Sequence, residues 1–144
     1  SMVAHKARAK GFSSLEDFNT KEVTLAVKLG TTAEQAARKF MPNAQLKLFE
    51  NESQVFQELN LGRVHAVVAS APLPVFHALK FPDKLFVPLE ENFTKEPIGF
   101  VLRKGDHDAL NYFNNWILNM HSQGFLKEKT KYWFESKQWE DLVK

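Results

Sequence analysis

The sequence predicts an α/β fold with a mostly parallel sheet flanked by helices. Short, β-branched apolar runs alternate along the chain with segments whose apolar residues recur at helical spacing. Helices between consecutive strands are the usual connection of parallel strands, because a parallel pair needs a long crossover. The chain has 144 residues, of which 44% are apolar and 25% charged, which is enough to bury a core and excludes a disordered chain.

Each predicted element in the first two thirds of the chain is bounded by a local signal. Strands are expected at 23–27, 46–49, 64–69 and 85–87. Helices are expected at 31–40, which Pro42 stops, and from Asn51 to Gly62, a glycine where a helix C-terminus favours one. A third helix is expected at 72–79. The run at 64–69 is almost wholly apolar and predicts a strand that is covered on both faces.

After Pro97 the pattern changes to one further strand followed by helices. A strand is expected at 98–103 and a turn at 104–106. A long helix follows and ends at Gly124, and helices are also expected through 126–134 and 139–143. The long helix carries an apolar stripe at helical spacing, formed by Leu110, Phe113, Ile117 and Met120. Such a stripe must pack against another surface.

Composition excludes several function classes. The absence of cysteine excludes disulfides, thiolate zinc sites and thiol nucleophiles. The 19 basic and 17 acidic residues are nearly balanced, so no nucleic-acid partner is predicted. The five histidines are scattered, and no phosphate-loop, dinucleotide or nucleophile-elbow motif occurs. The sequence therefore predicts no metal, no cofactor and no catalytic residues. No apolar run approaches the length of about 20 residues that spans a bilayer.

One motif indicates a binding site. The segment 28–35 (KLGTTAEQ) places a glycine turn and two hydroxyls between a strand and a helix. Thr31 with Glu34 and Thr32 with Gln35 both have the spacing of a capping box. The helix start offers backbone N–H groups and a positive dipole end, which suit a carboxylate or phosphate. It lies where open α/β sheets bind ligands, although ordinary helix capping explains the same residues.

Several segments together resemble a known family. They are 12–18 (FSSLEDF), 23–32 (VTLAVKLGTT), 56–70 (FQELNLGRVHAVVAS), 97–105 (PIGFVLRKG), and the C-terminal residues 114–116, 124–125 and 132–134. In this order and spacing they resemble the amino-acid-binding family of periplasmic solute-binding proteins, the two-lobed receptors of ABC importers. The resemblance implies a lobe with the periplasmic-binding-protein fold, plus a C-terminal strand and helices from the second lobe.

The resemblance also implies a domain organisation. Residues 1–12 would be a hinge strand and lead-in, 13–95 a complete lobe two, and 96–144 the return hinge with the C-terminal part of lobe one. The chain is then a fragment that lacks the first half of lobe one. The C-terminal apolar stripe would be exposed, or buried between chains by swapping or homo-oligomer formation.

Site residues are carried over from the family motif. Gly30, Thr31 and Thr32 would receive the α-carboxylate of the ligand, and Lys28 stands where some relatives contact ligand. Ser70 stands where the family usually has an aspartate that pairs with the α-ammonium group. A serine accepts a hydrogen bond but does not neutralise a cation, so the resemblance leaves the ligand unidentified. His65 also replaces a common aspartate, at a position that is usually structural.

The implied function is ligand capture, not catalysis. The intact protein would be the periplasmic or extracytoplasmic component of an ABC importer. It would bind a small polar solute, an amino acid or related carboxylate. It would enclose this solute by hinge closure and then dock on a membrane permease. Three alternatives stay open at this point. They are the sensing domain of a signalling receptor, a dehydratase-like enzyme of the same fold, and a plain interaction domain.

Overall fold

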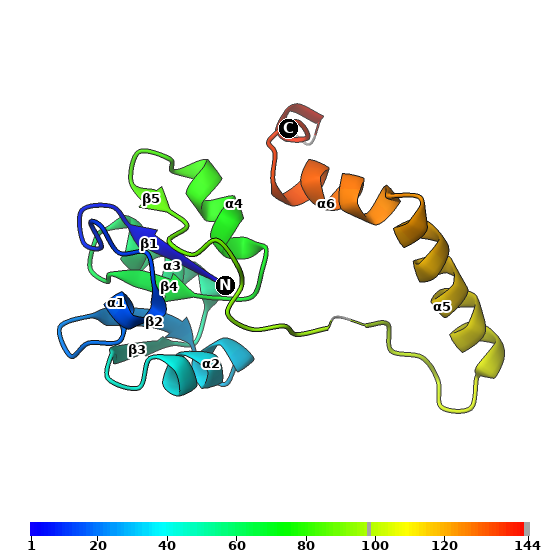
Figure 1. Ribbon diagram of the computed structural model, residues 1–144, viewed down its shortest axis with the longest axis horizontal. Helices are drawn as coiled ribbons and strands as arrows, with labels where there is room; N and C mark the ends of the chain where they lie inside the picture. The colour runs from blue at the N-terminus through cyan, green and yellow to red at the C-terminus, as the bar shows by residue number, and fades with distance from the viewer. Residues whose placement is uncertain (98, 143–144) are drawn as a thin grey trace. The chain divides into compact units, whose positions relative to one another are not determined.

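The computed structural model describes residues 1–97 and 99–142 and divides the chain into two compact units, residues 1–94 and 95–144 (Figure 1). The first unit contains a five-stranded sheet. Its strands are β1 (Met2–His5), β2 (Thr24–Lys28), β3 (Gln45–Phe49), β4 (Ala66–Val68) and β5 (Leu85–Phe86). Their order across the sheet is β3-β2-β4-β1-β5.

The sheet is mixed. Strand β2 pairs in parallel with β3 and β4, whereas β1 is antiparallel to both of its neighbours, β4 and β5. Four strands therefore run in one direction and β1 runs in the other. The predicted α/β class is confirmed, and the strands predicted between residues 23 and 87 are all present with boundaries shifted by a few residues.

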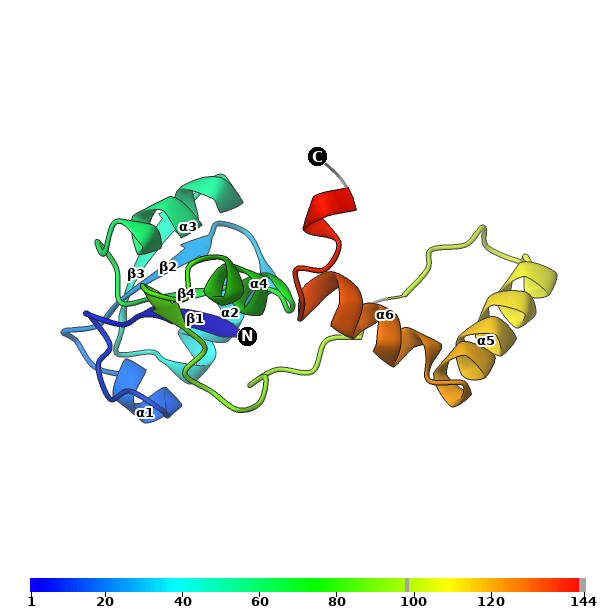
Figure 2. The same cartoon turned by 90° about the horizontal axis from the view of Figure 1, so that it is seen from above.

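Four helices accompany this sheet: α1 (Leu15–Phe18), α2 (Thr32–Phe40), α3 (Glu52–Asn60) and α4 (Leu73–Lys80). Ser14 and Asp17 form a capping box at α1, with the Ser14 hydroxyl accepting the Asp17 N–H. Thr31, a predicted capping residue, is the N-cap of α2, and α3 follows Asn51 as expected. Figure 2 shows the sheet with α3 on one side and α1 on the other.

Two apolar clusters cover the two faces of the sheet. Because side chains alternate along a strand, Leu25 and Val27 of β2 join one cluster and Ala26 joins the other. Phe18 of α1 and Ala37 of α2 complete the first cluster. Helix α3 completes the second with Val55, Phe56 and Leu59, the three residues predicted to share its buried side. Strand β4 is buried along its whole length, as predicted for a strand covered on both faces.

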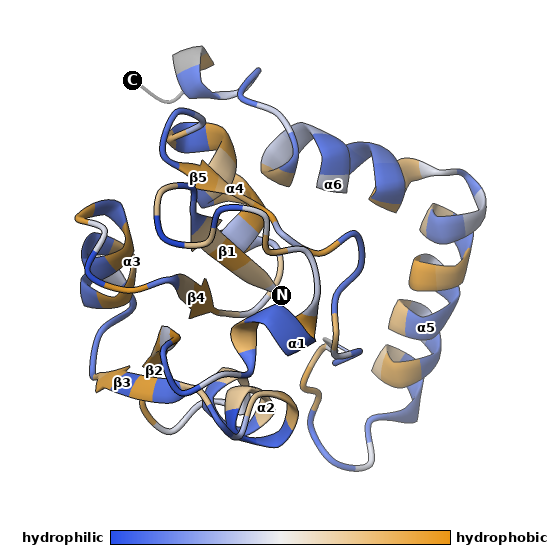
Figure 3. Ribbon diagram, turned by 60° about the vertical axis from the view of Figure 1, so that its left-hand side comes forward, coloured by the Kyte–Doolittle hydropathy of each residue, from blue (hydrophilic) through white to orange (hydrophobic). Residues whose placement is uncertain are grey.

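The second unit is helical in its described part. Helix α5 (His107–Ser122) is capped by Asp106, whose carboxylate accepts the N–H of Ala109 at 2.9 Å. Gly124, at φ 74°, separates it from α6 (Phe125–Phe134), and a short 3₁₀ turn spans Glu140–Leu142. No residue of α5 is buried, and apolar bands run along the helix (Figure 3). Of the predicted apolar stripe, Leu110 is exposed, whereas Phe113, Ile117 and Met120 are half-buried. Burial of the stripe between chains stays a prediction.

The strand expected at 98–103 is wrong over residues 99–103, which form no strand, while Ile98 lies outside the described residues. A strand needs a neighbour for its backbone N–H and C=O groups. The described residues of 95–144 contain no second strand to supply one. The expected last helix survives as the 3₁₀ turn, and Val143 lies outside the described residues. No helix in the described ranges has the length and apolar character needed to cross a membrane.

His65 gives the first unit a pH dependence. It precedes β4, and its Nδ1 accepts the backbone N–H of Thr24 at 3.0 Å. Its backbone N–H also donates to the Thr24 carbonyl at 2.8 Å. Burial, and then the charge of Arg8, lower the pKa of His65 below its ordinary value. The site therefore holds a neutral imidazole, the structural role that the sequence indicated.

We expect the free energy of unfolding to fall as the pH drops below about 6.5. In that range the unfolded chain binds a proton that the folded His65 takes up only at lower pH, so protons favour unfolding. The measurement is the urea midpoint at pH 7.5 and pH 5.5. His65→Gln should reduce the decline without abolishing it, because burial also lowers the pKa of His5 and His77. An identical decline in both proteins would contradict this account.

Candidate functional site

The sequence-predicted site residues lie at one edge of the sheet. Strands β2 and β4 are parallel neighbours, with Leu25 opposite Ala66 and Ala26 opposite Val67. Their carboxyl ends therefore meet at the same edge. The loop of Gly30, Thr31 and Thr32 follows β2, and Ser70 follows β4 by two residues. The topology brings these residues to adjacent strand ends, where open α/β sheets usually bind ligands.

Thr31 shapes the loop rather than facing solvent freely. Its hydroxyl donates to the Lys28 carbonyl at 2.7 Å and accepts the Glu34 N–H at 3.3 Å. The structure thus selects the Thr31–Glu34 cap over the alternative of Thr32 with Gln35. Thr32 is the first residue of α2 and is exposed. Helix geometry leaves the N–H groups of the first turn, Thr32 and Ala33, without a carbonyl in their own helix.

The Glu34 carboxylate accepts the hydrogen bond that the Gly30 N–H could give to a ligand. Its Oε2 accepts the Gly30 N–H at 2.8 Å, and its Oε1 accepts from Arg38 Nε and Nη2 at 3.0 and 2.9 Å. The Gly30 N–H and then Arg38 hold the pKa of Glu34 below its usual range. Two of the expected anion-binding groups, the Gly30 N–H and the Thr31 hydroxyl, are therefore engaged by the protein itself. The first-turn N–H groups of α2 are the donors that the geometry leaves for an anion.

The other two predicted residues flank this loop. Lys28 is the half-buried last residue of β2, and its carbonyl anchors Thr31. Ser70 is exposed, and its carbonyl accepts the Leu73 N–H at 3.1 Å, which begins the turn into α4. Within the described ranges, no group of three or more acidic or histidine side chains is arranged to hold a metal ion.

Replacing Gly30 with alanine should destabilise the first unit by about 1 kcal/mol. Gly30 has φ 74°, a left-handed conformation that L side chains adopt at a cost, whereas an added Cβ would meet no atom within 4 Å. The expected loss is therefore conformational and not steric. Gly30→Asn should lose less, because asparagine tolerates this conformation. Urea unfolding of the two variants measures the difference, and equal losses would show that the backbone conformation is not the cause.

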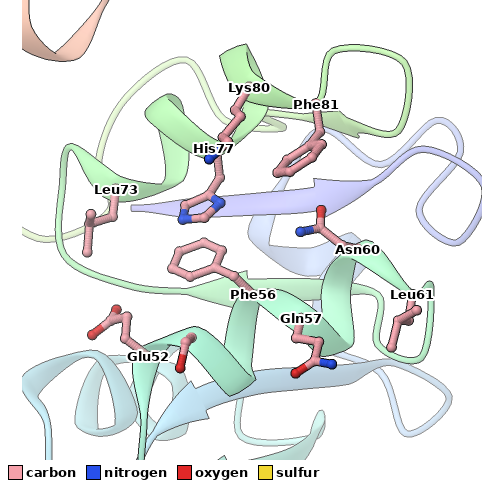
Figure 4. Close-up of a pocket in the computed structure, with 10 residues that line it drawn as sticks. Glu52, Phe56, Gln57, Asn60, Leu61, Leu73, His77, Lys80 and Phe81 are labelled. Carbon is pink, nitrogen blue, oxygen red and sulfur yellow. The ribbon is translucent and has the colours of Figure 1, made fainter. Parts of the chain in front are cut away.

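A second concave site was missed by sequence reasoning. A groove of about 470 Å³ lies between α3 and α4, and its lining includes Phe56, Asn60 and His77 (Figure 4). The rings of Phe56 and His77 are stacked, with centroids 3.6 Å apart and planes 9° apart. The apolar spacing of both helices was readable in the sequence. Their packing side by side was not, because it depends on the strand order.

Comparison with known proteins agrees with the motifs. No family model matches the chain. It is 29% identical over 119 residues to the L-cystine-binding protein TcyJ of Escherichia coli K12, covering 83% of this chain and 44% of the relative. It is 28% identical over 122 residues to the glutamine-binding protein GlnH of an ABC transporter of Bacillus subtilis, covering 85% of this chain and 44% of the relative. The chain thus spans about half the length of these curated relatives.

Solved structures extend the likeness to the fold. An ancestral cationic amino acid solute-binding protein matches with a TM-score of 0.77 and 39% identity, over 92% of this chain and 56% of that one. A putative ABC-transporter binding component from Wolinella succinogenes, complexed with lysine, matches with a TM-score of 0.82 and 33% identity, over 98% of this chain and 60% of that one. An ancestral cyclohexadienyl dehydratase matches with a TM-score of 0.60 and 32% identity, over 94% of this chain and 56% of that one.

These comparisons confirm the resemblance that the sequence motifs indicate. The chain is similar to amino-acid-binding solute-binding proteins over about half of their length, and it has the mixed α/β sheet and flanking helices of their lobes. The assignment of residues to hinges and lobes, and the roles of the individual site residues, stay predictions.

Proposed function

We propose that this chain contributes one wall of the solute site of an ABC-importer binding protein, and that the N-terminus of α2 binds the α-carboxylate of an amino acid. The observation that carries the proposal is the meeting of the Gly30–Thr32 loop and Ser70 at adjacent strand ends. The relatives named for cystine, glutamine, lysine and cationic amino acids support this ligand class. An α-carboxylate is common to all of these ligands, and a helix N-terminus suits it.

The binding donors in this proposal are the N–H groups of Thr32 and Ala33. Glu34 already accepts the Gly30 N–H, and the Thr31 hydroxyl is bonded within the turn. The Glu34–Arg38 pair fixes the loop from the side of α2. An arriving carboxylate would therefore meet a loop whose shape is already set, which limits the entropy lost on binding.

Replacing Ser70 with aspartate should tighten the binding of L-lysine by about tenfold, the effect of one charge-assisted hydrogen bond to an ammonium group. Ser70 accepts a hydrogen bond but carries no charge to offset the α-ammonium. Calorimetric titration of the two proteins measures the change, and Ser70→Asn is the matched control without a charge. Equal affinities for the aspartate and asparagine variants would remove Ser70 from the ammonium subsite.

The whole protein in which such a chain works would close around its solute by hinge motion and deliver it to a membrane permease. The site would then lie in the periplasm or an equivalent extracytoplasmic space. The support for this step is the family relationship, since the curated relatives include the binding protein of an ABC transporter.

A dehydratase is the second candidate, because one similar structure is an ancestral cyclohexadienyl dehydratase. Such chemistry needs a general acid or base in the site. The carboxyl group of the loop, Glu34, has a lowered pKa, which disfavours the protonated form that an acid needs. Its two oxygens already accept hydrogen bonds from the Gly30 N–H and from Arg38, which leaves it poorly placed to act as a base. We therefore favour binding. Incubation with prephenate, followed by assay for the aromatic product, separates the two functions.

The experiment that tests the binding proposal is calorimetric titration of the chain with L-lysine, L-arginine, L-glutamine and L-cystine. Cadaverine is the matched control, because it is lysine without the α-carboxylate. We expect at least one amino acid to bind and cadaverine not to bind. Absence of heat with all four amino acids, or equal binding of lysine and cadaverine, would overturn the proposal.

A further inference from the structure

The groove between α3 and α4 lies in a different part of the first unit from the Gly30–Thr32 loop of the proposed solute site. Its floor residue, Phe56, packs in the apolar cluster that contains Ala26, whereas α2 covers the opposite cluster. Phe56 is 4% exposed and His77 lies flat on its ring. Phe81 adds a third aromatic side chain to the lining, which also contains leucine, polar and charged side chains (Figure 4).

Two polar atoms in this groove are buried and make no hydrogen bond among the residues that the structure describes. They are Asn60 Oδ1 on α3 and His77 Nδ1 on α4. Buried polar atoms are normally paired, and an unpaired one costs free energy. Asn60 Oδ1 requires a donor. His77 Nδ1 accepts or donates according to which ring nitrogen carries the proton.

The charges that line the groove balance. Glu52 of α3 and Lys80 of α4 are the charged side chains in its lining, and the Lys80 Nζ lies 5.9 Å from the centre of the Phe81 ring. One negative and one positive group give no net preference for a charged guest. The volume of about 470 Å³ falls in the range of pockets that hold small organic molecules.

We propose that this groove binds a small neutral aromatic molecule carrying one N–H or O–H donor, at a site independent of the solute loop. The ring packs against His77, whose other face covers Phe56, and against Phe81, and the donor bonds to Asn60 Oδ1. A phenol or an indole has the required chemistry. Binding here bridges α3 and α4.

The probe is indole, titrated into ¹⁵N-labelled protein and followed through backbone amide shifts. We expect saturable shifts in α3 and α4, including Asn60 and His77, that are unaffected by excess L-lysine. Benzothiophene, a ring of similar shape without the N–H, should bind at least fivefold more weakly. Shifts spread over the exposed apolar residues of α5, or no saturable shift, would overturn the site. Equal binding of benzothiophene would overturn the role of Asn60.

A matched pair of variants tests the location. Leu61→Glu introduces a charge at a lining residue that is 54% exposed, and Leu29→Glu introduces the same charge at a residue that is 53% exposed and does not line the groove. We expect at least a tenfold loss of indole affinity for the first and none for the second. Leu73→Glu, at another exposed lining residue, replaces Leu61→Glu if the latter fails to fold. Equal effects of the groove and control variants would contradict the proposal.

Discussion

Replacing Thr32 with proline is expected to weaken amino-acid binding by about 100-fold while leaving the fold intact. This is the loss expected when the α-carboxylate of the bound ligand, a buried charged group, has no donor at that position. Thr32 is the first residue of α2, where proline is tolerated because its fixed φ suits a helix start and its missing N–H has no helical partner. Thr31 precedes it in an extended conformation, φ −104° and ψ 162°, as a residue before proline requires. The substitution therefore removes one of the two proposed N–H donors, together with the Thr32 hydroxyl, and leaves the Ala33 N–H in place.

Thr32→Ala is the matched control, because it removes the hydroxyl and keeps the N–H. Calorimetric titration with L-lysine compares the three proteins, and urea unfolding checks that stability is unchanged. An equal loss of binding in Thr32→Pro and Thr32→Ala would assign the contact to the hydroxyl, because both variants lack it. Binding unchanged in both would show that the ligand does not contact the start of α2.

Replacing Leu59 with alanine should lower the free energy of unfolding of the first unit by about 3 kcal/mol, within the range measured for buried leucines. Leu59 is fully buried on α3 and packs in the cluster with Val3 and Val67 of the sheet. The loss combines the transfer of the side chain with the cavity left behind, because close-packed surroundings relax only partly. Urea unfolding followed by circular dichroism measures it.

Leu61→Ala is the control for this prediction. Leu61 caps the same helix two residues later and is 54% exposed, so its truncation should change stability by less than about 0.5 kcal/mol. If the two alanine variants lose equal stability, the packing of α3 on the sheet is not what stabilises the unit.

The parts of the fold that were predicted correctly depend on local signals. Helix α2 follows from a glycine turn, a hydroxyl cap and Pro42, all within fifteen residues of sequence. The burial of Val55, Phe56 and Leu59 follows from helical periodicity. The antiparallel direction of β1 was not predictable in this way, because it depends on pairing with β4 across more than sixty residues of chain.

The failures have the same physical origin. Residues 99–103 have the composition of a strand. A strand forms only beside a partner strand, and the composition of a segment does not show whether a partner is present. At the site, the spacing of Thr31 and Glu34 predicted a cap correctly. It did not show that the Glu34 carboxylate would reach the Gly30 N–H instead of the N–H of Thr31 itself. The groove between α3 and α4 depends on tertiary packing and left no motif in the sequence.

The most direct test of the central claim is amide chemical-shift mapping of the ¹⁵N-labelled chain during titration with L-lysine. The account predicts that the largest saturable shifts fall on Thr32 and Ala33 at the start of α2, with Ser70 affected at the neighbouring strand end. Shifts confined to α3 and α4, or no saturable shift at the start of α2, would contradict the assignment of this edge as the solute site.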